Sequence, residues 1–78
     1  MLAVIDILFN QKRRAMLEFK KNILTKVSFD LELFEKELKK ALKWLMRHEL
    51  IQLKNWCYQN FKGSHRQVIE QCFSNAGL

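Results

Sequence analysis

The sequence predicts an all-α protein, a small bundle of three or four helices joined by short connections. Apolar residues recur at steps of three and four positions, as on one face of a helix, and no stretch alternates as a half-buried strand does. The 78 residues include no proline and only two glycines, so little interrupts a helix. Apolar residues make up 49% and charged residues 28% of the chain, a balance that is typical of a folded helical domain and argues against disorder.

The length allows one domain. A chain of this size buries only about 60% of its unfolded surface. We therefore expect residues 1–78 to form a single helical domain of limited stability, which self-association would increase. Met16 begins the segment MLEFKK and is a second plausible start. Residues 1–15 are thus open to two interpretations, as part of the core or as an N-terminal extension of a minimal domain.

The first third of the chain is expected to be helical from residue 3 to residue 26, as one helix or as two collinear pieces. The break between two pieces would fall in the polar stretch from Asn10 to Arg14. The apolar residues that share one face are Ile5, Leu8, Phe9, Met16, Phe19, Ile23 and Val27, with Lys12 among them. Ser28 then supplies a capping hydroxyl and Asp30 a carboxylate near the positive end of the next helix.

The stretch from Phe29 to Phe61 contains no helix breaker, yet its apolar face rotates. Each residue advances by about 100° around a helix, and the apolar sets of the two halves point roughly 110° apart. The first set is Phe34, Leu38, Ala41, Leu42 and Leu45, and the second is Leu50, Leu53, Cys57 and Phe61. Because a straight helix cannot bury both sets in one core, we expect a turn or sharp kink near residues 46–49. The alternative is one helix of about 32 residues whose halves pack on different partners in an oligomer.

The last helix is predicted to span about residues 65–74. Gly63 is a stop signal for the preceding helix, and Ser64 with Gln67 matches a capping box. The inward-facing residues are Val68, Ile69, Cys72 and Phe73, and Asn75 to Gly77 end the helix. The predicted core of the whole bundle consists of Phe34, Leu38, Leu42, Leu45, Leu53, Trp56, Phe61, Ile69 and Phe73.

Neither catalytic nor metal-binding residues are predicted. His48 and Glu49 resemble the start of a zinc-peptidase HExxH motif, but Gln52 stands where the second histidine is needed. Cys57 and Cys72 lack the short C-x-x-C spacing of structural zinc sites, and both are expected to be buried as small hydrophobic residues. We expect a protein that is not an enzyme and needs no cofactor.

A row of positive charges is the most informative polar feature. Its members step by four, three and four positions and therefore lie along one side of a helix: Lys36, Lys40, Lys43 and Arg47. One interpretation is a solvated helix face, in which Glu32 pairs with Lys36 and Glu35 with Lys39. The other is a basic surface that binds an acidic protein, a membrane surface, or nucleic acid through its phosphates without sequence specificity.

Trp44 indicates a contact surface. It lies away from the apolar stripe of its half of the stretch, and Leu33 and Ile51 fall near the same direction if the helix is continuous. Tryptophan next to cationic residues is favoured at protein interfaces. We therefore expect a non-catalytic interaction or oligomerisation module whose partner is a second copy or another protein.

No run reaches the roughly 20 apolar residues of a membrane span, and a cytoplasmic location is expected.

Overall fold

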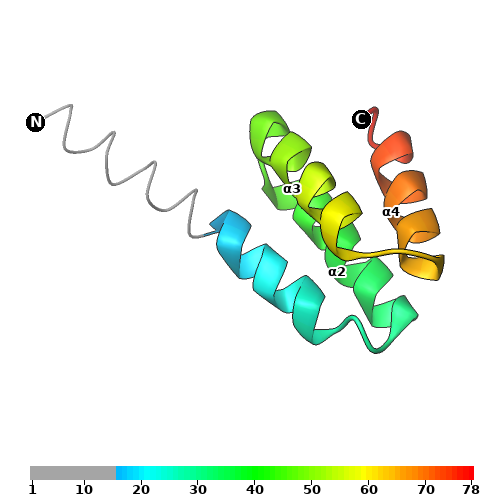
Figure 1. The fold of residues 1–78 in the computed structure, drawn as a ribbon. Coiled ribbons are helices and arrows are strands. Elements are labelled where there is room, and N and C mark those ends of the chain that lie inside the picture. Colours follow the sequence, from blue (N-terminus) through cyan, green and yellow to red (C-terminus); the bar gives the residue numbers. More distant parts are fainter. Residues whose placement is uncertain (1–15) are drawn as a thin grey trace, which may run out of the picture.

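The computed structural model describes residues 16–78, and these form four helices without any strand, which confirms the all-α bundle. A helical segment at residues 16–26 is followed by α2 (Leu31–Trp44), α3 (Arg47–Asn60) and α4 (Ser64–Asn75). The chain reverses its direction at each connection, and α4 packs against both α2 and α3 (Figure 1). None of the helices in this part of the chain is long and apolar enough to cross a membrane.

The turn predicted from the rotating apolar face is present, and the single long helix does not form. Helix α2 ends at Trp44 and α3 begins at Arg47, so the turn consists of Leu45 and Met46, one residue earlier than expected. Both turn residues adopt extended backbone angles that any amino acid tolerates, so neither glycine nor proline is needed. The carboxylate of Glu49 accepts a hydrogen bond from the backbone N–H of Met46 at 3.0 Å, which caps α3.

The start of α2 depends on Asp30 and not on Ser28. The Asp30 carboxylate accepts hydrogen bonds from the backbone N–H groups of Glu32 at 3.0 Å and Leu33 at 3.3 Å. The Ser28 hydroxyl instead donates to the carbonyl of Thr25 at 2.7 Å, within the preceding turn. The prediction of a Ser28 cap was therefore wrong, because its hydroxyl is already used by the helix that ends before it.

The start of α4 also differs in detail from the prediction. Ser64 is the first helical residue, Gly63 is the cap, and no side chain caps the helix, so the Ser64–Gln67 capping box is absent. The backbone N–H of Gln67 donates to the Gly63 carbonyl at 3.2 Å. Gly63 has φ 66° and ψ −131°, a combination that almost only glycine adopts. Glycine is thus required at the predicted boundary because of the backbone conformation of the turn, and the boundary does not depend on a capping box.

The buried face of the first helical segment is only in part the predicted one: of the predicted residues, Val27 packs half-buried against the core and Ile23 is half-buried. Leu17 and Leu24, two turns apart, are buried in the core, whereas Met16 and Phe19 are exposed. The amine of Lys21 lies 5.9 Å from the centre of the Trp56 ring, which places this side of the segment against α3. Both faces have helical spacing, and packing on α3 buries the face that carries Leu17 and Leu24. The predicted residues Ile5, Leu8 and Phe9, and the predicted break at residues 10–14, lie outside the described residues.

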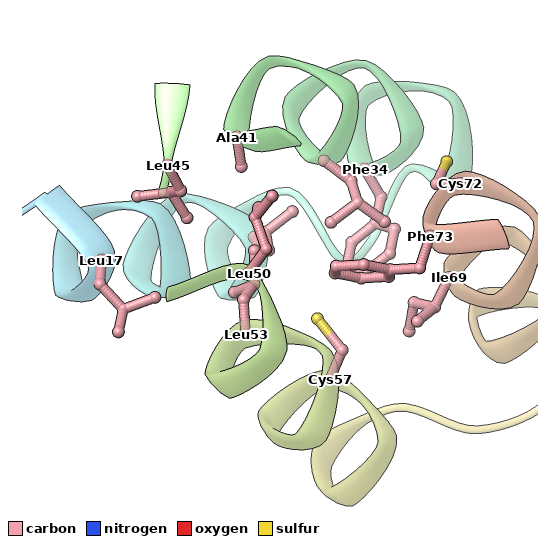
Figure 2. Close-up of a cluster of buried hydrophobic side chains, with 12 residues drawn as sticks. Leu17, Phe34, Ala41, Leu45, Leu50, Leu53, Cys57, Ile69, Cys72 and Phe73 are labelled. Carbon is pink, nitrogen blue, oxygen red and sulfur yellow. The ribbon is translucent and has the colours of Figure 1, made fainter. Parts of the chain in front are cut away.

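The core contains the predicted residues and, in addition, Leu17, Leu24, Ala41, Leu50, Cys57 and Cys72. Six of the nine are buried, namely Phe34, Leu38, Leu45, Leu53, Ile69 and Phe73, and Leu42, Trp56 and Phe61 pack against them half-buried. Figure 2 shows Leu17, Leu45, Leu50 and Leu53 towards one end of this cluster, and Phe34, Ile69 and Phe73 towards the other. The core therefore runs from the α2–α3 turn to the aromatic residues near the start of α2.

The aromatic end of the core is fixed by His65. Its Nε2 lies 2.6 Å from the carbonyl oxygen of Ser28, and because a carbonyl only accepts, Nε2 carries the proton and donates. The His65 ring also meets Phe34 edge-on at 5.0 Å and stacks on Phe61 at 5.8 Å. The first turn of α4 is thereby tied to the connection that precedes α2.

Candidate interaction surface

Trp44 is the last residue of α2, and 71% of its surface is exposed. The backbone explains this exposure. At about 100° per residue, Trp44 lies about 90° around the helix from the buried stripe of Phe34, Leu38 and Ala41. The chain then turns at Leu45, whose side chain enters the core, so no later turn of α2 covers the indole. An indole with this exposure is available for contact.

Leu33 and Ile51, the other predicted interface residues, are exposed by 39% and 47%. The three residues do not lie along one face of a single helix as predicted. Leu33 and Trp44 do share one face of α2, separated by about 16 Å of helix. Between them lies the ion pair of Lys40 and Glu37 at 3.2 Å, which divides the apolar surface. Ile51 belongs to α3, beyond the turn, so the alignment that assumed a continuous helix does not apply.

Met46 is the exposed apolar neighbour of Trp44 that the sequence pattern did not indicate. It occupies the turn and is 46% exposed. Its exposure follows only from the location of the turn, because in a continuous helix Met46 would fall on the apolar face of Leu50, Leu53 and Cys57. Methionine is enriched at protein interfaces and adapts to irregular partners. Around the turn, Lys43, Trp44, Met46 and Arg47 are all exposed while only Leu45 is buried.

The predicted basic row is exposed, and the turn divides it. Lys36, Lys40 and Lys43 lie on α2, whereas Arg47 is the first residue of α3. Among the described residues, the predicted pair of Glu35 and Lys39 forms at 3.1 Å, but Glu32 and Lys36 do not form an ion pair. Lys40 pairs instead with Glu37. The solvated-face interpretation therefore explains part of the row and leaves Lys36, Lys43 and Arg47 without an ion pair in residues 16–78.

Arg47 is poorly explained by helix stability. Lys43 lies in the last turn of α2, where the helix dipole favours a cation. Arg47 lies in the first turn of α3, where the dipole disfavours a cation by about 0.3–1 kcal/mol. Glu49, which is 5% exposed, supplies the negative charge at this helix start but forms no ion pair with Arg47. Residues that oppose local stability are expected where function requires them.

Neither cysteine is a candidate nucleophile, and their predicted burial is confirmed. Burial raises the pKa of the Cys57 thiol to about 12, against a smaller opposing effect of Lys21. Burial also raises the pKa of Cys72; Glu35 adds to this shift and Lys39 opposes it. Thiols that keep their protons at neutral pH are weak nucleophiles. Both cysteines are free and act as apolar packing groups.

A shallow, open depression of about 360 Å³ lies between α2 and α4. Its lining consists of Lys39, Leu42, Lys43, Cys72, Asn75 and Ala76. It brings no pair of acid and base together. In residues 16–78, no three His, Cys, Asp or Glu side chains are close enough to hold a metal ion, and His48 is exposed.

Comparison with known proteins does not assign a family. The chain matches no protein-family model, and no curated protein or solved structure is significantly similar to it. The functional argument therefore depends on the surface around the α2–α3 turn.

Proposed function

We propose that this protein is a small non-catalytic helical module that contacts another protein, or a second copy of itself, through the surface around Trp44. The observation that carries the proposal is the 71% exposure of this tryptophan next to exposed Met46 and Arg47. Tryptophan, methionine and arginine are the residue types enriched in the buried centres of interfaces. Trp44 is not part of the core, and coverage by a partner would explain why so large an apolar side chain stands at the surface.

Site-specific photocrosslinking in the native cells tests this proposal. A photoreactive benzoylphenylalanine replaces Trp44 in one variant and the exposed Gln71 of α4 in a control variant. We expect discrete crosslinked products from position 44 and none from position 71. A product with the mass of two chains identifies self-association, and any other mass identifies a different partner. Absence of products from position 44, or identical products from both positions, would refute the proposal.

A second candidate function is non-specific nucleic-acid binding, which the exposure of Lys36, Lys40, Lys43 and Arg47 favours. Four phosphate contacts would give a plot of log affinity against log salt concentration with a slope of about −3 to −4. A gel shift with duplex and single-stranded probes at low and high salt measures this slope. No binding at low salt would remove this candidate and leave the protein-contact proposal intact.

A further inference from the structure

The chemistry of the surface around the α2–α3 turn restricts its partner. We call the exposed residues Lys40, Lys43, Trp44, Met46 and Arg47 the corner surface. Its apolar part is Trp44 and Met46, both exposed, which precede and follow the buried Leu45 in the chain. The apolar residues are thus bordered by cations from the end of α2 and from the start of α3.

The corner surface has a local excess of positive charge. From Leu38 to His48 the chain carries four lysines and arginines and no carboxylate. Glu35 and Glu37 compensate Lys39 and Lys40 through ion pairs of 3.1 and 3.2 Å. Lys43 and Arg47 form no ion pair within residues 16–78. Since Arg47 also opposes the dipole of α3, its charge is best satisfied by a group outside the described chain.

A second copy of the chain is a poor occupant of this surface. A two-fold contact centred on Trp44 would place Lys43 and Arg47 of both copies in the same interface, since such contacts are self-complementary. Like charges brought together across an interface disfavour association. The same argument favours a partner that presents carboxylates around an apolar centre.

Nucleic acid and lipid fit the corner surface less well. Single-stranded nucleic acid binds to successive aromatic side chains on which its bases stack, and the corner surface has one. Binding in a lipid interface depends on a long apolar face of a helix, whereas here the apolar part is a tryptophan and a methionine at a turn.

We infer that the corner surface binds an acidic segment of a partner protein, with an apolar side chain of that segment against Trp44 and Met46 and its carboxylates near Lys43 and Arg47. This inference rests on the proposed function and names the partner's chemistry. The indole contributes buried contact area, and the two cations contribute selectivity and faster association. Arginine additionally binds a carboxylate through two parallel hydrogen bonds.

A random library of 12-residue peptides, selected on the full-length protein at 150 mM salt, tests the inference. We expect the selected peptides to combine Asp or Glu with Leu, Phe or Trp, and this enrichment to disappear on the Trp44→Ala variant. Enrichment of cationic peptides, acidic enrichment that persists on Trp44→Ala, or no enrichment would each overturn the inference. None of these results alters the photocrosslinking from position 44, so failure here is distinguishable from failure of the proposed function.

Charge-reversal variants locate the binding. The double variant Lys43→Glu, Arg47→Glu changes the corner surface, and the control Lys26→Glu, Lys62→Glu makes the same change in net charge at two other exposed positions. For the best selected peptide we expect at least a tenfold weaker Kd with the first variant and less than a threefold change with the control. Equal weakening by both variants would show that net charge alone attracts the peptide and would overturn the inference.

Discussion

Near its N-terminal end α2 buries a phenylalanine in the core, whereas at its C-terminal end it exposes a tryptophan. Phe34 is fully buried and meets Phe61 edge-on at 4.9 Å and His65 at 5.0 Å. Ten residues later on the same helix, Trp44 is 71% exposed. The difference follows from direction around the helix, because Phe34 lies in the stripe that faces the core and Trp44 lies about 90° away from it.

This contrast separates two uses of large aromatic residues in one helix. The aromatic residues at the N-terminal end hold α2, the end of α3 and the start of α4 together. The aromatic residue at the C-terminal end, Trp44, is mostly exposed and is not part of the core. Substitutions at the first end should therefore affect the free energy of unfolding, and substitutions at the second should affect binding.

The largest expected effect is that of Phe34→Ala, which removes a fully buried ring. We expect a loss of about 3–5 kcal/mol in the free energy of unfolding, measured by urea denaturation. If this variant does not fold, Phe34→Leu should still cost about 1 kcal/mol. The control Phe29→Ala changes an exposed phenylalanine, and its expected effect is below about 0.5 kcal/mol. Equal effects of Phe34→Ala and Phe29→Ala would contradict the contrast.

His65→Ala should cost about 2 kcal/mol, because the carbonyl of Ser28 loses its donor and two rings lose a neighbour. Ser64→Ala is the matched control one residue earlier, and it should have little effect, since Ser64 does not cap α4. Thermal unfolding followed by circular dichroism measures both variants. A larger loss from Ser64→Ala than from His65→Ala would indicate that the Ser64 side chain caps α4 after all, and would contradict this account.

High pH should weaken the fold through Cys57. The thiol ionises near its ordinary pKa of 9.0 in the unfolded chain and at about 12 in the folded one, so the folded state holds the proton more tightly. The free energy of unfolding therefore decreases between these pH values, by about 1.4 kcal/mol per pH unit at most. Cys57→Ala removes this contribution, so its profile should be flatter than that of the wild type. Parallel profiles would contradict the burial of the thiol.

Asp30→Ala should cost about 1 kcal/mol, because the first turn of α2 loses a cap for two backbone N–H groups. Ser28→Ala should cost less, since its hydroxyl serves only the exposed turn before the helix. Urea denaturation of the two variants ranks them directly. The reverse ranking would make Ser28 the true cap.

The sequence predicts the helices and the α2–α3 turn well, because both follow from the spacing of apolar side chains. The rotation of the apolar face between Leu45 and Leu50 indicated the turn, and the structure decides for it against the alternative of one long helix. The caps at Ser28 and Ser64 were predicted wrongly, because the capping residue is chosen by local backbone angles that several polar residues can satisfy. Glu49, a buried carboxylate that caps α3, was not predicted for the same reason.

The candidate surface was predicted only in part. The exposure of Trp44 follows from its direction on the helix wheel, but its supposed alignment with Ile51 required a helix that does not form. Met46 became a candidate only when the turn was located. The buried face of the first segment was also predicted only in part: Val27 packs against the core as expected, but Leu17 and Leu24 are buried in place of Met16 and Phe19, and only packing decides between the two faces.

The unfolding free energies of Trp44→Ala and Trp56→Ala, measured side by side in urea, test most directly whether stability and contact are separated along this chain. Trp56 packs edge-on against Phe61 at 5.6 Å and lies beneath the Lys21 amine. We predict a loss of about 2 kcal/mol or more for Trp56→Ala and a change within about 0.5 kcal/mol for Trp44→Ala. A loss for Trp44→Ala as large as that for Trp56→Ala would show that the exposed tryptophan maintains the fold, and would contradict its assignment to a contact surface.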